Sequence, residues 1–191
     1  MQSRRQGHMA GFWDWRSKPA SVAAPVVAEE SALEPVELYT ATAMVYGEVD
    51  PQGRRLSDIL NANSHLAIRD PKSTSVIAHV SGTEGEGWTP IAAEEILMAM
   101  PPEHVSPRQL RVHRRQHRVR ITTGPYQLVG SAHLPPGAEL HSYALQRRIK
   151  FLAVTDVSAY STVDPAFERM APVVLVNVGP IEELTEVLRI S

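Results

Sequence analysis

The chain of 191 residues contains no cysteine, and this absence excludes disulfide bonds, thiolate metal ligands and cysteine nucleophiles. Aromatic residues make up 6% of the sequence, and no apolar run approaches the roughly 18 residues that a membrane-spanning helix needs. The formal net charge of -2 is too small to indicate a general binder of polyanions. The start of the sequence shows no apolar stretch of the kind found in secretory signals, and together with the missing cysteine this favours a cytoplasmic protein.

Signature motifs of common enzyme classes are also missing. The sequence has no Gly-x-Ser-x-Gly elbow, no Gly-x-x-x-x-Gly-Lys phosphate loop and no Gly-x-Gly-x-x-Gly. Gly82, Gly85 and Gly87 form a glycine-rich stretch, but the two glutamates within it would repel a phosphate. We therefore expect a protein that is not an enzyme, and we predict no cofactor and no bound metal.

Two sets of residues leave an enzymatic or metal-binding role open as an alternative. His113 and His117 are four residues apart, so they share a face on a helix, or lie about 13 Å apart on a strand, and no third ligand is close in sequence. Asp70 and Asp156 follow short apolar segments in the same way, which favours turn capping over paired catalytic carboxylates. The scattered histidines are expected to be structural or solvated, and these are His65, His79, His133 and His141.

What the sequence does contain is a pattern that occurs twice. In both copies a glycine interrupts a strand-like segment, a turn with a second glycine follows, and an apolar triplet later leads to an aspartate. The matching segments are Val45–Gly53 with Val129–Gly137, Leu66–Asp70 with Leu152–Asp156, and Ile96–Pro102 with Val174–Pro180. A repeat of this kind reports architecture, and it predicts two copies of one small strand-rich unit.

Local patterns predict mainly strands. Gly47 and Gly130 break the alternation of apolar and polar residues, which indicates a β-bulge in each copy. We expect strands within 36–49, 66–68, 96–100, 117–123, 126–134, 151–157 and 173–178, a short helical turn at 57–61, and a polar loop at 81–87. The segment Ile181–Ile190 fits a helix or a short strand, and the first copy shows no obvious turn at Ala41-Thr42.

These elements predict a mainly β fold of two tandem small barrels, each a bent sheet with short helical turns. Bending a sheet around a glycine lets it cover its own apolar face and reduces its exposed edges. We expect a flexible N-terminal tail at residues 1–35, a first barrel-like repeat at 36–103 and a second at 104–191. Because small barrels of this kind keep an open edge, a homo-oligomer formed by edge pairing is also expected.

The second copy contains Val119-x-Ile121 before Gly124, then Gly130, then Leu152-Ala153-Val154-x-Asp156, and finally Val174–Val178 followed by Gly179. With these motifs it resembles the Sm-like family of small β-barrels, and SH3-like barrels would give a similar pattern. The resemblance to the Sm-like family implies a strongly bent five-stranded barrel, and in many Sm-like proteins it implies RNA binding. Those proteins place an Asp and an Asn between the second and third strands, whereas Leu134–Leu140 contains neither.

Two groups of residues are candidates for binding. Phe12, Trp13 and Trp15 are large aromatic side chains within the tail, which could dock on a partner, insert at a membrane surface or fold back onto the barrels, and we predict docking on a protein partner. Six arginines form a basic segment that could bind an anion, a nucleic acid or an acidic partner, or could be a solvated strand face: Arg108, Arg111, Arg114, Arg115, Arg118 and Arg120.

The sequence therefore predicts a non-enzymatic assembly or adaptor module, which oligomerises or docks partners through barrel edges and the aromatic tail. The alternative function is RNA or DNA binding through the arginine-rich segment 108–120. An enzyme that uses His113, His117 or the two aspartates is the third hypothesis.

Overall fold

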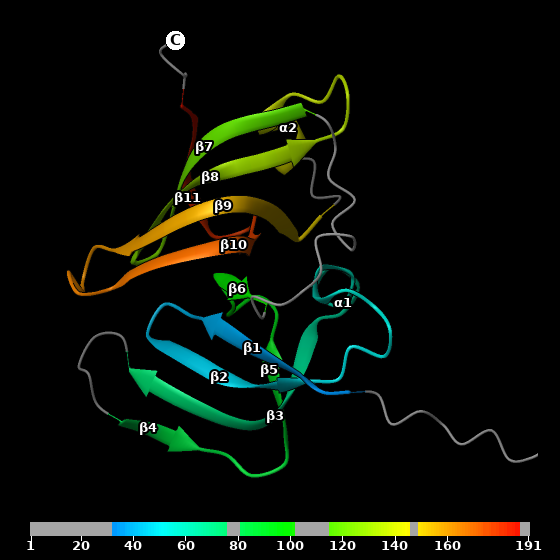
Figure 1. Cartoon of the computed structure of the whole chain (residues 1–191), viewed down its shortest axis with the longest axis vertical. Helices are drawn as coiled ribbons and strands as arrows, with labels where there is room; N and C mark the ends of the chain where they lie inside the picture. Colours follow the sequence, from blue (N-terminus) through cyan, green and yellow to red (C-terminus); the bar gives the residue numbers. More distant parts are fainter. Residues whose placement is uncertain (1–31, 76–80, 102–114, 146–148, 188–191) are drawn as a thin grey trace, which may run out of the picture. The chain divides into compact units, whose positions relative to one another are not determined.

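The computed structural model describes residues 32–75, 81–101, 115–145 and 149–187 (Figure 1). The chain divides into the units Met1–Glu30 and Ser31–Ser191, and every described residue belongs to the second unit. Its elements in chain order are β1 (Glu34–Tyr39), β2 (Ala43–Val49), α1 (Leu56–Ala62), β3 (His65–Ser75), β4 (Ser81–Glu84), β5 (Trp88–Ala92), β6 (Met98–Met100), β7 (Arg115–Thr123), β8 (Tyr126–Leu134), α2 (Leu140–Leu145), β9 (Phe151–Ser161), β10 (Glu168–Asn177) and β11 (Ile181–Glu186).

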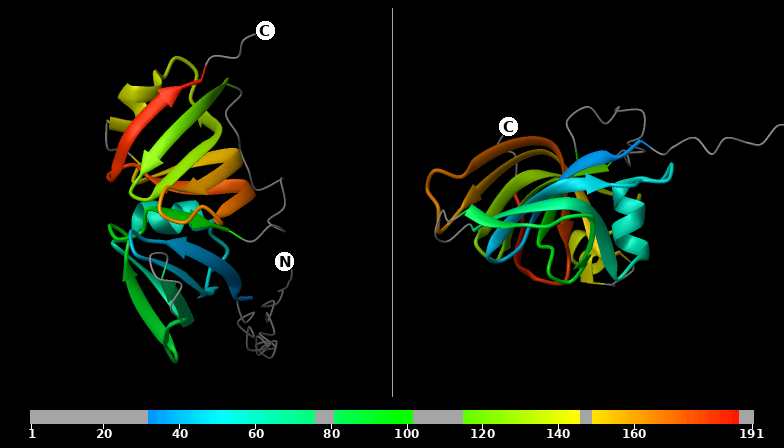
Figure 2. Two further views of the ribbon diagram at one scale, coloured as in Figure 1. Left: turned by 90° about the vertical axis from the view of Figure 1, so that its left-hand side faces the viewer. Right: turned by 90° about the horizontal axis from the view of Figure 1, so that it is seen from below.

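The described strands form one open antiparallel sheet, so the prediction of a mainly β fold is confirmed. The strands follow the order β11-β7-β8-β9-β10-β6-β1-β2-β3-β4, and β5 pairs with β3. Two further views show the bending of the strands (Figure 2). We call β1–β6 with α1 the first half and β7–β11 with α2 the second half.

The two halves pair their strands in the same order. In the first half the last strand, β6, pairs with β1, followed by β2, β3 and then β4 and β5. In the second half the last strand, β11, pairs with β7, followed by β8, β9 and β10. A short helix follows the second strand in each half. The sequence repeat is therefore matched by a repeated pairing order within the single sheet.

The predicted bulges lie at the two expected glycines. The register between β2 and β3 shifts around Gly47, and the register between β8 and β9 shifts around Gly130. A Cβ atom on Gly47 would lie 2.9 Å from the carbonyl oxygen of Arg69, and one on Gly130 would lie 3.0 Å from that of Thr155. Only glycine leaves room for the neighbouring strand to approach this closely.

Two further backbone features also recur. A four-residue turn is closed by a hydrogen bond of 2.8 Å in Pro51–Arg54 and 3.0 Å in Pro135–Ala138, and the third residue of each turn is a glycine with positive φ. Asp70 and Asp156 both adopt a left-handed backbone, with φ of 47° and 51°. Aspartate tolerates this conformation better than most residues, which explains its occurrence at both positions.

The sheet separates two hydrophobic cores. One core is formed mostly by the first half and includes Leu38, Leu60 and Ile68, and the other is formed mostly by the second half. Where the halves meet, successive residues of β10 alternate between them, because Leu175 packs into the first core and Val176 into the second. Successive side chains of a strand point to opposite faces, so the central strands carry apolar residues at consecutive positions.

The structure corrects two sequence-based expectations and decides a third that was left open. Residues 81–84 form β4, so the polar loop predicted for 81–87 is shorter than expected. The turn that seemed missing at Ala41-Thr42 is present, because the Thr40 hydroxyl accepts the N–H of Ala43 at 3.0 Å and joins β1 to β2. The segment Ile181–Glu186 is a strand, which decides between the helix and the strand left open above.

The third pair of repeat segments is also wrong as an equivalence. Ile96–Pro102 contains β6, whose counterpart by pairing is β11, whereas Val174–Pro180 contains the end of β10. The two segments lie side by side instead, with Ala99 opposite Leu175. They look alike because both are central strands with a core on each face.

Candidate functional site: the junction and the sheet edges

The junction between the halves is a short antiparallel pairing of β6 with β10. Ala99 lies opposite Leu175, and Met98 opposite Val176. The N–H of Asn177 donates to the carbonyl of Leu97 at 2.9 Å, which extends the pairing by one residue. Within this chain, the last strand of one half is thus joined edge to edge with the fourth strand of the other.

Two asparagine side chains reinforce the junction. The amide nitrogen of Asn177, in β10, donates to the carbonyls of Ala93 and Ile96 at 3.1 and 2.9 Å, and its oxygen accepts the N–H of Gly179. Asn177 is buried, so these bonds satisfy groups that water does not reach. This side chain holds the turn that precedes β6 against the second half.

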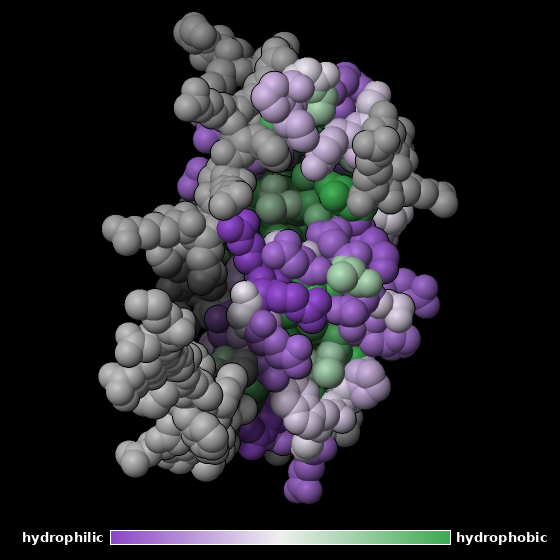
Figure 3. Space-filling model, turned by 90° about the vertical axis from the view of Figure 1, so that its right-hand side faces the viewer, coloured by the Kyte–Doolittle hydropathy of each residue, from purple (hydrophilic) through white to green (hydrophobic). Residues whose placement is uncertain are grey.

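Asn61 makes the reciprocal connection from α1. Its side-chain oxygen accepts the N–H groups of Lys150 and Phe151 at 2.7 and 3.0 Å, at the start of β9. The helix places Asn61 there because Leu56, Ile59 and Leu60 bury its apolar face in the first core. The side of the molecule that carries α1 shows hydrophilic residues across its middle (Figure 3).

A groove opens at one end of the junction, where β6 stops. Pro101 and Pro102 follow β6, and proline has no N–H with which to continue a ladder. Among the described strands, β10 residues 168–172 therefore pair with β9 alone. The groove has a volume of about 530 Å³ and is lined by both halves: Pro35, Val36, Glu37, Tyr46, Met100, Pro101, Arg169, Met170, Ala171 and Pro172.

The groove is partly apolar and carries charges of both signs. Tyr46 and Met170 are exposed in it, with 45% and 70% of their surfaces accessible. Glu37 accepts a hydrogen bond of 2.7 Å from the Tyr39 hydroxyl, and burial together with this carboxylate raises the pKa of Tyr39. Arg169 lies over the ring of Phe167, 5.9 Å from its centre.

The two ends of the sheet are the other candidate binding surfaces. β11 has only β7 as a strand neighbour among the described residues, and β4 and β5 have only β3. The N–H of Val187 donates to Arg118 at 2.7 Å, so every second residue of β11 points toward β7. Leu184 and Glu186 consequently direct their N–H and C=O groups to the open side.

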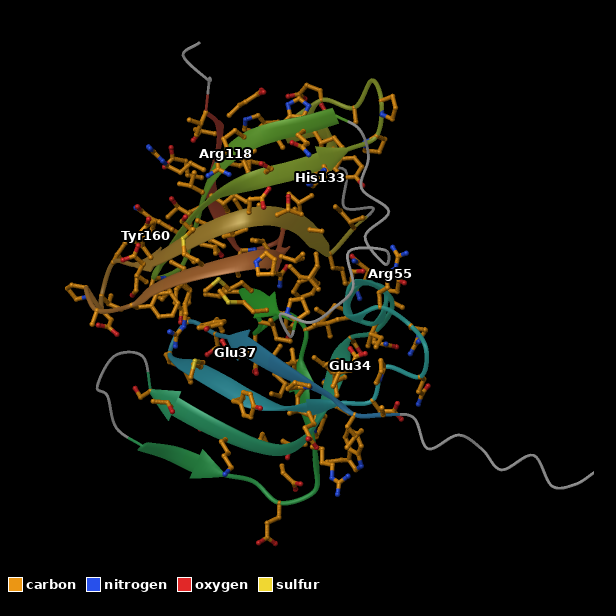
Figure 4. All side chains as sticks on the ribbon, viewed as in Figure 1. Glu34, Glu37, Arg55, Arg118, His133 and Tyr160 are labelled. Atoms are coloured by element: carbon orange, nitrogen blue, oxygen red, sulfur yellow. The ribbon has the colours of Figure 1, made fainter. Side chains whose placement is uncertain are left out.

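The structure places two of the six predicted anion-binding arginines in full. Arg118 and Arg120 point away from the second core, on the side opposite Val119 and Ile121. Arg118 is labelled in Figure 4, on β7. Its guanidinium donates to the carbonyl of Asp156 at 3.1 Å. Arg115 begins β7, but its side chain is outside the described part, as are Arg108, Arg111 and Arg114 in full.

The predicted aromatic docking residues, Phe12, Trp13 and Trp15, also lie outside the described residues, and so do His79 and His113. His117 is on the core side of β7, and its Nδ1 atom lies 2.9 Å from Oε1 of Glu186, a hydrogen-bond contact that ties β7 to β11. His133 contacts the hydroxyl of Thr155 at 2.7 Å on the outer face. Within the described ranges no three potential ligand side chains come together as a metal site.

The two aspartates lie in different halves, and each lies inside a strand, Asp70 in β3 and Asp156 in β9, rather than at the turn expected from the sequence. The Asp70 carboxylate accepts the N–H of Gly87 at 2.8 Å, which fixes the connection between β4 and β5. The carbonyl of Asp156 accepts the Arg118 hydrogen bond. Each aspartate lies beside the bulge of its own half; the Asp70 carboxylate caps a loop, whereas Asp156 contributes its main-chain carbonyl.

Sequence reasoning missed Asn61 and Asn177, which hold the junction, and Pro90, which lies in the edge strand β5 opposite Ala67. Asn177 ends an apolar run, which is a weak signal of a buried amide. The roles of Asn61 and Pro90 depend on which strand lies next to each of them in the fold. No signal in the sequence identifies that strand, because it depends on sheet order.

Comparison of the chain with protein-family models, with curated proteins and with solved structures finds no match. None of the helices within the described residues is long and apolar enough to cross a membrane.

Proposed function

We propose that this protein is a non-enzymatic assembly or adaptor module, built from two tandem small barrels of the Sm-like kind. Support for the architecture comes from the common pairing order of the two halves, from the glycine bulge in each, and from the two separate cores. A cytoplasmic location and a docking role for Phe12, Trp13 and Trp15 belong to the same proposal.

The observation that carries the proposal is the set of strand edges. The β6–β10 junction is an example, inside the chain, of one half joined to another through main-chain hydrogen bonds. The outer side of β11 offers the same kind of edge with no partner among the described strands. Addition of a strand to such an edge is a common mode of protein recognition.

The test compares two substitutions at one exposed position in the full chain. Glu186→Pro removes an N–H that points to the open side of β11, whereas Glu186→Ala removes the same carboxylate and keeps that N–H. We expect complexes isolated with the chain from its own cells, or oligomers seen by sedimentation, to be lost in Glu186→Pro and kept in Glu186→Ala. A chain that sediments as a monomer and is recovered alone would contradict the assembly function.

Nucleic-acid binding remains a second candidate, favoured by the common outward direction of Arg118 and Arg120. It predicts a mobility shift of single-stranded RNA or DNA that weakens as salt rises, because arginines release counterions from phosphates. The double variant Arg118→Ala/Arg120→Ala should reduce the salt slope by about two, at roughly one per phosphate contact. Arg69→Ala/Arg169→Ala, on other strands, is the matched control, and the absence of a shift at low salt removes this candidate.

A further inference from the structure

We infer that β11 binds an extended basic segment of a different protein, and that the chain does not join head to tail with copies of itself. The inference rests on the proposed assembly function and specifies its edge and its partner. It follows from a comparison of the internal β6–β10 junction with the two outer edges of the sheet.

The internal junction shows what an edge needs in order to pair. The N–H of Asn177 points to β6, because it donates to Leu97. Alternate residues of a strand point the same way, so the N–H of Leu175 also points to β6, where Ala99 lies opposite. The fourth strand of the second half therefore supplies N–H donors at both of these positions.

The first half has proline at the position that corresponds to Leu175. Leu175 pairs with Ala153 in β9, and Pro90 pairs with Ala67, which matches Ala153 in the repeat. The N–H of Ala93 donates to Ser64 at 2.8 Å, so the nitrogen of Pro90 faces the open side of β5. There it has no hydrogen to donate, and its ring occupies the place where a partner carbonyl would lie.

Two other requirements of the junction are also absent from the outer edges. Asn177 pairs with Phe151, and its counterpart Ala92 pairs with His65, so the first half has no amide with which to clamp a partner's turn. The counterpart of the buried Met98 is Glu183, which is exposed and charged. If two copies joined in the same way as the two halves do, β11 of one copy would pair with β5 of the other. Compared with the β6–β10 junction, that pairing would lack one main-chain hydrogen bond, the amide clamp and one apolar contact.

The β11 edge itself is intact, and its charge defines the partner. It contains no proline, and Leu184 and Glu186 present their main-chain groups to the open side. Three of its six residues are glutamates, at 182, 183 and 186. Pairing of β11 with the β11 of another copy would set glutamates against glutamates, which is destabilising in a sheet. An extended segment with alternating Lys or Arg residues could pair with the open main-chain groups of β11 and also place positive charges beside its glutamates.

The first experiment uses synthetic seven-residue peptides and amide NMR of the full chain. A peptide of alternating valine and Lys or Arg should shift the amide signals of Leu184 and Glu186 and slow their hydrogen exchange. The peptide in which Glu replaces Lys and Arg should bind at least tenfold more weakly. Glu186→Pro should weaken binding of the basic peptide at least tenfold relative to Glu186→Ala. Equal binding of both peptides, no binding at low salt, or shifts confined to β5 would overturn the inference.

The second experiment exploits the absence of cysteine from the chain. The double variant Glu183→Cys/Ile91→Cys places one cysteine on β11 and one on β5, at the positions that correspond to Met98 and Val176. Met98 and Val176 are a directly opposite pair that shares no main-chain hydrogen bonds, and the side chains of such a pair are close enough for a disulfide. If β11 of one copy paired with β5 of the next, the two cysteines could therefore link the copies. After mild oxidation, we expect a non-reducing gel to show no more disulfide-linked multimers of this variant than of the control variant Glu183→Cys/Gln52→Cys. Adding Pro90→Leu and Ala92→Asn should then produce a ladder of such multimers.

The outcomes separate the inference from the proposed function. A ladder in the chain that keeps Pro90 and Ala92 would overturn the inference and would still support assembly through edges. No ladder after both substitutions would show that Pro90 and Ala92 are not what prevents self-association, and would also overturn it. Loss of the assembly function itself would appear separately, as a chain without partners in cells.

Discussion

The two halves of the sheet pair their strands in the same order but differ where those strands meet something else. Leu175 on the fourth strand of the second half has a partner strand, whereas its counterpart Pro90 faces the open side of β5. On the outer face, Glu37 of the first half corresponds to Arg120 of the second, because they pair with the equivalent residues Tyr46 and Val129. The side-chain charge at this position is therefore opposite in the two halves. The comparison teaches that glycines and buried apolar residues maintain the scaffold, while edge and outer-face residues decide what each half can bind.

Tyr39 shows how the surroundings change the role of one position. Its counterpart in the second half, Thr122, lies on the outer face and is half-buried. Tyr39 is fully buried and packs edge-on against Tyr126 and Phe167, both from the second half. The same register position is thus part of an outer face in one half and of the neighbouring core in the other.

The largest expected effect would break the feature that the halves share. Gly47→Ala and Gly130→Ala should each destabilise the protein by about 3 kcal/mol, because the new methyl group overlaps the neighbouring strand. Urea unfolding measures both losses, and Gly53→Ala is the control, since a Cβ there meets nothing within 4 Å although its φ is positive. A variant at either bulge that loses less than Gly53→Ala would show that this half does not need its bend.

A smaller effect is expected at the junction, where the halves differ. Asn177→Leu leaves two carbonyls and one N–H without their partner, and should cost about 2 kcal/mol. It should also make the halves unfold less cooperatively, which tryptophan fluorescence and circular dichroism would show as separate transitions. Asn63→Ala is the control, because its side-chain amide donates to the carbonyl of Ile59 in α1, inside the first half. Equal effects of the two variants would argue against a clamp at Asn177.

The smallest effect compares the two buried tyrosines. The Tyr126 hydroxyl is buried without a hydrogen-bond partner among the described residues, so Tyr126→Phe should change the unfolding free energy by less than about 0.5 kcal/mol. Tyr39→Phe removes the bond to Glu37 and should cost about 1 kcal/mol. Urea unfolding at pH 7 compares them, and a larger loss at Tyr126 would reveal a partner for its hydroxyl.

The tyrosines also predict a dependence on alkaline pH. Burial raises the pKa of Tyr126 from 10.0 to about 12, so between these values the unfolded chain loses its proton first. The stabilising contribution of Tyr126 is complete below pH 10 and disappears as the pH rises toward 12. The unfolding free energy should fall less steeply in Tyr126→Phe than in the wild type over this range, and parallel curves would contradict the assignment.

Much of the fold could be predicted from local sequence signals. The bulges at Gly47 and Gly130 and the hairpin turn at Gly124-Pro125 follow from glycine and proline chemistry, which acts over a few residues. The sheet order could not be predicted in this way. The apolar segments around Ala99 and Leu175 look like repeats of each other, because burial on two faces produces the same composition whatever the topology.

The candidate site was predicted only in outline. Open edges were expected from the small size of each unit, but the sequence does not say which edge is closed or by which residue. Pro90 is one of 15 prolines, and its ring matters because the register with β3 turns its nitrogen to the open side. Arg118 and Arg120 were predicted as candidates, and the structure adds the face on which they lie.

The sequence by itself determined the strand-rich character of the chain, its two bends and its lack of cysteine chemistry, since these depend on residue type and near neighbours. The tertiary structure alone decided that β6 pairs with β10, that Asn61 and Asn177 clamp this junction, and that the outer edges of the sheet are unlike each other. The physical reason is that a main-chain hydrogen bond across strands depends on which residue lies opposite, and that partner is 76 residues away for Ala99 and Leu175.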